Sequence, residues 1–314
     1  MERKKGLTGD KFSFIFIILP TIFLIVGYII NPGSRPSDSV ELLTYIFLLL
    51  ALVLLGVGFF SNKLSIGKQL KTLGWLSFTF YWATQPANLY ISEGGDVFNA
   101  AACIAGVYVL SYLAYQEWLS NKRREEISCL NWIAGAAVLA GIIYYGIDKT
   151  PIELWLRQVV ASHSAWFLGL VTGETVVVGG GDNLFIFYKQ TSIYLIFACT
   201  GVQAMVIFVG MLLPLPKVDM KRKIIGLLVT IIPVYILNFM RNAMVVFLTG
   251  NNITDFNVAH NYIGKGGSLI ALIVLLFIVI RIIPEVMDEI FCLTDLRKRN
   301  GPLEQSIGKI WRKK

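Results

Sequence analysis

About eight apolar segments, each close to the length of a bilayer-spanning helix, constrain this sequence more than any other feature. A helix rises about 1.5 Å per residue, so roughly 20 apolar residues cross the hydrocarbon core. Of the 314 residues, 55% are hydrophobic and only 15% are charged, which excludes an ordinary soluble domain. We therefore predict an all-α polytopic membrane protein. The expected spans are residues 12–30, 42–60, 73–91, 97–119, 127–147, 192–213, 223–248 and 266–286.

The basic residues predict how the chain crosses the membrane. With the N-terminus inside, the inner connections and the tail hold 21 lysines and arginines, whereas the outer connections hold five. Because basic residues favour the cytoplasmic side, both ends are expected inside, in a multi-pass protein of the cytoplasmic membrane. This placement also accounts for the net charge of +8 without a nucleic-acid partner. The first segment is too long for a signal peptide and lacks a small-residue cleavage site, so we expect it to be retained.

Residues 148–191 form the long outer connection. Its first part carries Trp155, His163 and Trp166 and is expected to be an interfacial helix, with His163 at the membrane surface. A ninth span is the alternative, but it would put the tail outside. Two β-prone runs around Gly179–Gly181 predict a hairpin. The expected division is a scaffold (1–147), an extracytoplasmic lid (148–191), a catalytic core (192–286) and a basic cytoplasmic tail (287–314).

Three reactive side chains are expected near one depth below the outer surface. Cys199 lies seven residues after Ser192, which is about 10 Å of helix, and Arg241 lies about 12 Å before the outer end of the next span. His260 precedes the last span on the same side. An arginine within a membrane segment is by default a functional-site hypothesis. The shared depth of these three side chains predicts thiol chemistry, at a site open to the extracytoplasmic side.

Each residue type suits a step of that chemistry. A thiol attacks as the thiolate, which a nearby cation such as Arg241 favours; Arg241 could equally hold an oxyanion. Histidine carries protons between a leaving amine and an incoming nucleophile. Amide side chains on the neighbouring turns are candidates to orient a substrate peptide, namely Gln203, Asn238 and Asn242.

The other cysteines and the glycines have simpler interpretations. Cys103, Cys129 and Cys292 are expected to be small apolar fillers, and their spacing argues against a disulfide framework. The sequence has no HExxH or CxxC spacing, so no metal or cofactor is expected. The glycine run 179–181 lacks a P-loop lysine and predicts a turn. Asn252 begins a glycosylation sequon in the last outer connection, which supports the orientation weakly.

Three short motifs together resemble those of the exosortase/archaeosortase family, and within it the archaeosortase A group. They are Ala198-Cys199-Thr200-Gly201, then Arg241-Asn242, then Ala259-His260-Asn261 before the final span. The resemblance covers residues 194–284 firmly. It implies that Cys199 is the nucleophile of an acyl-thioester and that Arg241 is the second essential residue. The third position varies in the family, and here it corresponds to His260 or, with a one-residue shift, to Asn261.

The resemblance also implies a substrate class. The family processes secreted proteins with a C-terminal signal made of a short motif, a membrane helix and a basic tail. In the archaeosortase A group the motif is Pro-Gly-Phe, and an archaeal membrane lipid is joined to the new C-terminus. Two alternatives stay open: a cysteine protease whose thioester water hydrolyses, or a non-enzymatic transporter or lipid-binding scaffold in which Arg241 is a counter-ion.

Overall fold

The computed structural model describes residues 14–33, 38–61, 65–91 and 97–311. Several residues used in the predictions lie outside these ranges: residues 12 and 13 of the first expected span, and the basic residues Arg3, Lys4, Lys5, Lys11, Arg35, Lys63, Arg312, Lys313 and Lys314. The chain forms two compact units. Unit 1 comprises residues 1–138 and 288–314, and unit 2 comprises residues 139–287. The expected lid and catalytic core thus both belong to unit 2, and the basic tail to unit 1.

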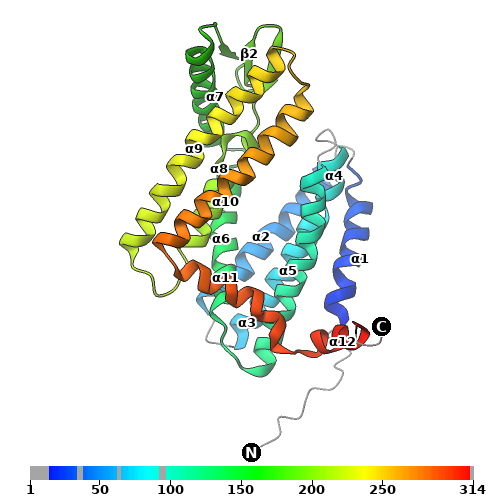
Figure 1. The fold of residues 1–314 in the computed structure, drawn as a ribbon. Helices are drawn as coiled ribbons and strands as arrows, with labels where there is room; N and C mark the ends of the chain where they lie inside the picture. Colours follow the sequence, from blue (N-terminus) through cyan, green and yellow to red (C-terminus); the bar gives the residue numbers. More distant parts are fainter. Residues whose placement is uncertain (1–13, 34–37, 62–64, 92–96, 312–314) are drawn as a thin grey trace, which may run out of the picture. The chain divides into compact units, whose positions relative to one another are not determined.

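Unit 1 is built on helix α3, which packs against three other helices of the unit (Figure 1). At its centre a salt bridge joins Lys71 Nζ to Glu117 Oε1 at 2.8 Å, with both side chains 1% exposed. A buried pair of this kind holds two helices in one register, because removing one partner leaves a buried charge. The helices of unit 1 are α1 (Ile15–Ile30), α2 (Asp38–Phe60), α3 (Ser65–Ala83), α4 (Pro86–Ile91), α5 (Val97–Arg123), η4 (Leu296–Arg299) and α12 (Pro302–Trp311).

The expected span 73–91 is wrong in its bounds. Helix α3 begins eight residues earlier, at Ser65, and ends at Ala83; the separate short helix α4 follows from Pro86. Proline lacks a backbone N–H and fits the first turn of a helix but not its interior, so Pro86 starts a new helix instead of continuing α3.

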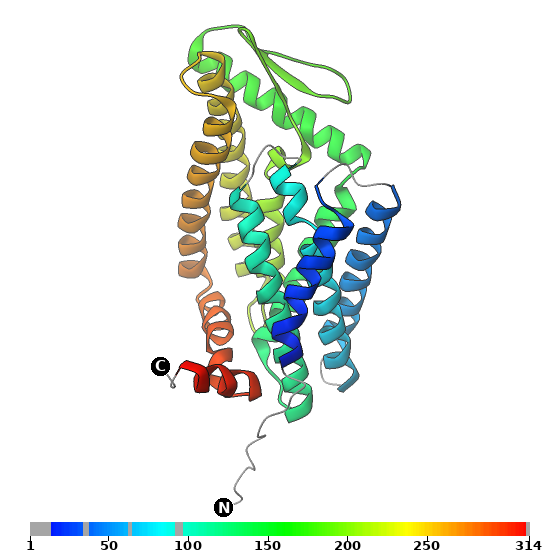
Figure 2. The same cartoon turned by 90° about the vertical axis from the view of Figure 1, so that its right-hand side faces the viewer.

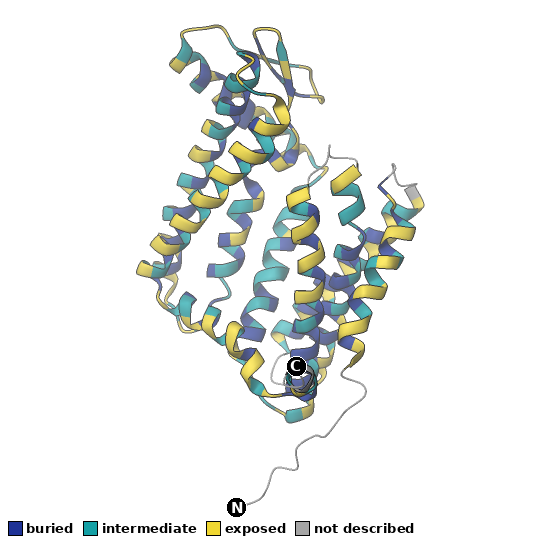
Figure 3. Ribbon diagram, turned by 45° about the vertical axis from the view of Figure 1, so that its right-hand side comes forward, coloured by how far each residue is buried: buried dark blue, intermediate teal, exposed yellow. Residues whose placement is uncertain are grey.

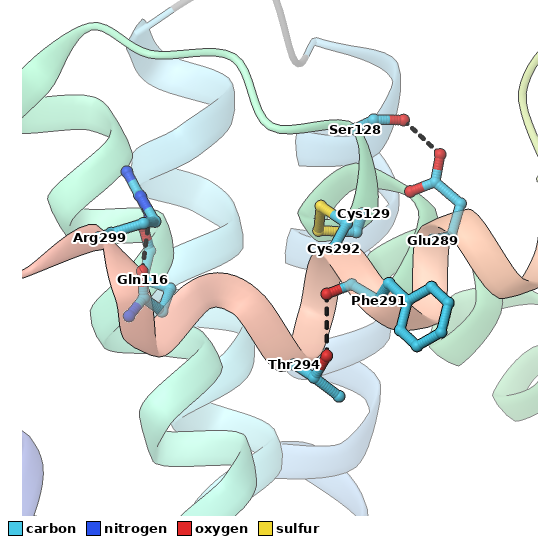
Figure 4. The surroundings of a disulfide bond; sticks show 8 residues. All are labelled: Gln116, Ser128, Cys129, Glu289, Phe291, Cys292, Thr294 and Arg299. Carbon is cyan, nitrogen blue, oxygen red and sulfur yellow. Dashed lines mark hydrogen bonds between the residues drawn. A yellow bond between two sulfur atoms is a disulfide. The ribbon is translucent and has the colours of Figure 1, made fainter.

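The expectation that no disulfide forms is also wrong. Cys129 and Cys292 are bonded, with Cα atoms 5.9 Å apart and 163 residues between them in sequence (Figure 4). They lie on α6 (Ser128–Ile147) and α11 (Glu285–Asp295), the two helices through which the chain passes between the units. Cysteines so distant in sequence carry no spacing signal, which is why the sequence did not reveal the pair.

Unit 2 is built on two long helices that run side by side, α9 (Met220–Gly250) and α10 (Lys265–Ile282), joined through the π-helical turn η3 (Val258–Gly264) (Figures 1 and 2). Helix α10 exposes large apolar side chains along its length, including Ile270 and Phe277 (Figure 3). Exposed apolar residues are expected where a helix faces lipid. The remaining elements are α7 (Pro151–Thr172), β1 (Val177–Gly179), β2 (Phe185–Tyr188), β3 (Thr191–Tyr194), η2 (Phe197–Thr200) and α8 (Val202–Leu212).

Within the described residues, five helical segments are long and apolar enough to cross a membrane, and α1 and α8 are shorter apolar helices. The chain is thus a largely helical, multi-pass membrane protein with a small sheet. The number of spans and their orientation stay predictions. The five segments are Ser39–Phe60, Val97–Arg123, Ser128–Ile147, Met220–Gly250 and Val258–Ile282.

The predicted hairpin is confirmed, but the sheet has a third strand. Strand β1 pairs antiparallel with β2, and β2 pairs antiparallel with β3, in the order β1-β2-β3. The first part of the outer connection is one continuous helix, α7, which ends at Gly173 in the left-handed conformation (φ 71°). Helix α7 and the sheet share a buried core with α9.

The expected span 192–213 is wrong. Residues Thr191–Tyr194 form a strand, Phe197–Thr200 form a 3₁₀ turn, and only Val202–Leu212 form an α-helix. The β-branched and aromatic residues of Thr191–Tyr194 pair with β2, as the register of Ile193 with Ile186 shows. Because a strand rises about 3.3 Å per residue, the helix-based depth of 10 Å for Cys199 does not hold.

Candidate active site

Cys199 lies on η2, immediately before helix α8. Its backbone N–H donates to the Ile196 carbonyl at 2.9 Å, and the Thr200 hydroxyl donates to the Phe197 carbonyl at 2.7 Å. The Phe197 ring is buried and stacks on Tyr144 of α6, with ring centroids 5.0 Å apart. These contacts fix the turn, so the Cys199 side chain is held at the N-terminal end of α8 by local hydrogen bonds and by one aromatic anchor.

Gly201 turns the chain from η2 into α8. Its φ is +79°, the left-handed region that residues with a side chain rarely adopt. A Cβ atom here would lie 2.8 Å from Asn238 Cγ and 3.0 Å from Asn238 Cβ, closer than such atoms approach. Both the backbone conformation and the close approach to α9 therefore require glycine at this position.

Two amides of α9 hold the Cys199 backbone. Asn238 Nδ2 donates to the Cys199 carbonyl oxygen at 2.8 Å, and Asn242 Nδ2 donates to the same oxygen at 2.9 Å. Both asparagines are buried. The two donors lie four residues apart on one face of α9 and satisfy both lone pairs of one carbonyl. In this structure the predicted substrate-orienting amides thus position the cysteine segment.

Arg241 lies on the same turns of α9. Its guanidinium is close enough to Cys199 for the two groups to interact electrostatically, and its Nε atom is buried with no hydrogen-bond acceptor among the described residues. Gly264, at the end of η3, leaves room for this side chain, since a Cβ atom there would lie 3.1 Å from Arg241 Nε. A buried guanidinium with an unused donor can receive an anion or a polarised carbonyl oxygen.

The third predicted position lies on η3. Ala259 is fully buried in the cluster that also contains Cys199 and Ala243 of α9. His260 follows it, half-buried, with its ring stacked on Phe256 at a centroid distance of 5.2 Å. The Asn261 side chain donates to Asn257 Oδ1 in its own segment. Of these two residues, His260 offers the titratable group.

Two further features concern this region: the predicted residue Gln203, and a contact between His163 and Tyr235 that was not predicted. Gln203 is exposed on the first turn of α8, and not one turn along a helix from Cys199 as expected. His163 of α7, expected only at the membrane surface, hydrogen-bonds through Nδ1 to the Tyr235 hydroxyl of α9 at 2.5 Å. Tyr235, Asn238 and Asn242 follow the i, i+3, i+7 pattern, and this polar stripe on an apolar helix is the sequence signal that could have found both contacts.

The arrangement suits nucleophilic chemistry on an electrophile that enters beside α8. Arg241 and the N-terminal end of α8 both favour a negative charge at Cys199. Cys199 offers a nucleophile, Arg241 a cation, and His260 and His163 an imidazole each, and acyl transfer requires groups of these three kinds.

Sequence comparison with known proteins gives the family of this chain. The sequence pattern of the transmembrane exosortases matches residues 7–278, most of the chain. This chain belongs to the transmembrane exosortase family. The match includes Cys199, Arg241 and His260, so the whole candidate site lies within the exosortase region.

A curated relative supports the same membership. The chain is 23% identical to archaeosortase A of Haloferax volcanii over 280 residues, which covers 75% of this chain and 90% of that protein. No solved structure gives a significant match. The exosortase motifs on which the resemblance rested are therefore accompanied by similarity along most of the chain.

Proposed function

We propose that this exosortase-family protein is a membrane-embedded cysteine transpeptidase that removes C-terminal sorting signals from secreted proteins. The observation that carries the proposal is the set of contacts that hold Cys199 in place. Its carbonyl oxygen accepts two hydrogen bonds from α9, its segment turns through an obligatory glycine, and Arg241 lies within electrostatic reach of its side chain. A cysteine that served only as an apolar filler would need none of these contacts.

The first half of the proposed reaction forms a thioester. The Cys199 thiolate attacks the carbonyl carbon of the scissile peptide bond, and the carbonyl π electrons move to the oxygen. The unused Nε–H of Arg241 is a donor available for that oxyanion. Collapse of the intermediate breaks the C–N bond, and the leaving amine takes a proton from the His260 imidazolium. The released product is the membrane helix of the signal with its basic tail.

The second half transfers the acyl group. A nucleophilic group of an archaeal membrane lipid attacks the thioester carbon, its proton passes to neutral His260, and the Cys199 thiolate leaves. If Asn261 holds this position instead, it can donate to the oxyanion but cannot accept the proton. The Pro-Gly-Phe motif and the lipid acceptor are what the resemblance to the archaeosortase A group implies for the substrates of this chain.

A tagged substrate with a Pro-Gly-Phe tripartite tail, co-expressed with the protein, tests the proposal. With the wild-type protein, intact-mass analysis is expected to show loss of the tail and gain of a lipid mass. Cys199→Ser is expected to reduce processing by at least about 10³-fold, because the nucleophile of a concerted site carries most of its rate.

The matched control is Cys103→Ser, the other buried cysteine that is not in the disulfide, which lies on α5. It is expected to leave processing unchanged. Tail loss without lipid gain would mean that water resolves the thioester and the protein is a protease. Normal processing by a well-expressed Cys199→Ser variant would contradict thiol catalysis and favour a transporter or scaffold.

A further inference from the structure

A second sulfur-containing site lies in unit 1, at the disulfide between α6 and α11. Cys129 Sγ, Cys292 Sγ and a carboxylate oxygen of Glu289 all lie within 4.8 Å of one another. Figure 4 shows the Glu289 carboxylate beside the two sulfurs. Glu289 and Cys292 are three residues apart on α11 and therefore share one face of that helix.

The carboxylate of Glu289 is incompletely satisfied. The side chain is 8% exposed, and the Ser128 hydroxyl donates to its Oε1 at 2.6 Å. Its Oε2 is buried with no hydrogen-bond donor among the described residues. A buried carboxylate oxygen without a donor costs free energy unless a cation or a donor occupies the site. This buried oxygen is available to a cation.

The charge pattern of the sequence predicts that this site is on the cytoplasmic side. Basic residues precede Cys129 at Lys122–Arg124 and follow Cys292 at Arg297–Arg299. Disulfides seldom persist in that compartment, where thiol reductants keep cysteines reduced. Two thiolates and one carboxylate are a donor set that zinc accepts.

We propose that Cys129, Cys292 and Glu289 form a zinc site when the disulfide is reduced. A tetrahedral zinc ion with Zn–S of about 2.3 Å and Zn–O of about 2.1 Å places its ligand atoms about 3.7 Å apart. That spacing fits a cluster whose donor atoms lie within 4.8 Å of one another. Ser128 orients the carboxylate through Oε1 and leaves Oε2 for the metal, and water completes the fourth position.

The exchange between the disulfide form and the zinc-bound form conserves electrons and protons. A cytoplasmic dithiol transfers two electrons and two protons to the Cys129–Cys292 bond and becomes a disulfide itself. The two thiols then release two protons as they bind one Zn²⁺. The metal replaces the covalent link between α6 and α11, so unit 1 keeps this connection in a reducing environment.

Metal analysis of the purified full-length protein tests the site. The protein is reduced with a phosphine, loaded with Zn²⁺, desalted without oxygen and assayed for metal, in a Cys199→Ser background that removes the other reactive thiol. We expect one zinc per chain for the reduced protein and none for protein that has first been oxidised to the disulfide form. Glu289→Gln is expected to weaken zinc binding at least tenfold, and Cys292→Ser to abolish it, while Cys103→Ser binds normally.

Two results would overturn the proposal. One is a reduced protein that binds no stoichiometric zinc, or binds it equally well with Cys292→Ser. The other comes from intact cells quenched in acid and alkylated: a quantitative Cys129–Cys292 disulfide there would identify a permanent covalent link. The comparison of oxidised with reduced protein needs no substitution at the site, so a misfolded variant cannot obscure the answer.

Discussion

Residue 201 determines where the Cys199 thiol lies, because the whole turn depends on a glycine that faces Asn238. Buried residues lie on both sides of this turn, where η2 packs against α9. A side chain at this position would push Asn238 away from the Cys199 carbonyl or force the turn out of its left-handed conformation. Either change releases the carbonyl from its amide donors.

We predict that Gly201→Ala lowers the free energy of unfolding by at least about 1–2 kcal/mol, the cost of a left-handed alanine. We expect tail removal to fall by about 10²-fold, because displacing a reacting group by about 1 Å has effects of that size. Thermal unfolding and the co-expression assay measure the two quantities. Gly181→Ala is the matched control, since Gly181 has φ +63° but no atom near its Cβ position. If both variants lose equal activity, the contact with Asn238 is irrelevant.

Single residues were the most predictable part of the site. Cys199 and Arg241 stand out because a polar group in an apolar helix costs free energy and needs a purpose. The function of Asn238 was less predictable, because an amide can bind a substrate or a backbone carbonyl equally well, and only the fold decides which carbonyl is near. The Cys129–Cys292 pair could not be predicted, because its members lie 163 residues apart.

At the scale of elements, the length of an apolar segment did not distinguish one spanning helix from a strand followed by a shorter helix. Residues 192–213 are mostly apolar, but tertiary pairing with β2 makes their first part a strand, and Gly201 separates the 3₁₀ turn from helix α8. Propensity is a weak guide when a neighbouring hairpin offers backbone partners. Segment 223–248, which forms one continuous helix within α9, was predicted correctly.

The junction of α9 with α11 provides a pH test. Arg222 donates to both oxygens of Glu285, at 2.7 and 2.9 Å, and these hydrogen bonds lower the pKa of Glu285 below its usual value of 4.5. The charged carboxylate therefore stabilises the fold above pH 4.5, and this contribution disappears as pH falls below that value. We predict that Glu285→Gln destabilises the protein at pH 7 by at most about 1 kcal/mol, since the pair is partly exposed.

Thermal unfolding in detergent at pH 7 and pH 4 measures the effect. The difference between wild type and Glu285→Gln is expected to shrink at the lower pH. Glu126→Gln is the control, because Glu126 is exposed and makes no ion pair with the described residues; its effect on stability is expected to be small at both pH values. A difference that is constant across this range would mean that the Arg222–Glu285 pair does not contribute through its charge.

For the whole molecule, the distribution of basic residues still carries the prediction of orientation, and it can be tested directly. The hairpin turn at Gly181 and the tail at Arg297 are both exposed and are expected on opposite sides of the membrane. We predict that Gly181→Cys reacts with a membrane-impermeant maleimide in intact cells, whereas Arg297→Cys reacts only after permeabilisation. The native cysteines are disulfide-bonded or buried, so wild type gives the background. Labelling of Arg297→Cys in intact cells would place the tail outside, as a ninth span through 151–172 would do. The Cys129–Cys292 site would then lose the reducing compartment on which its zinc form depends.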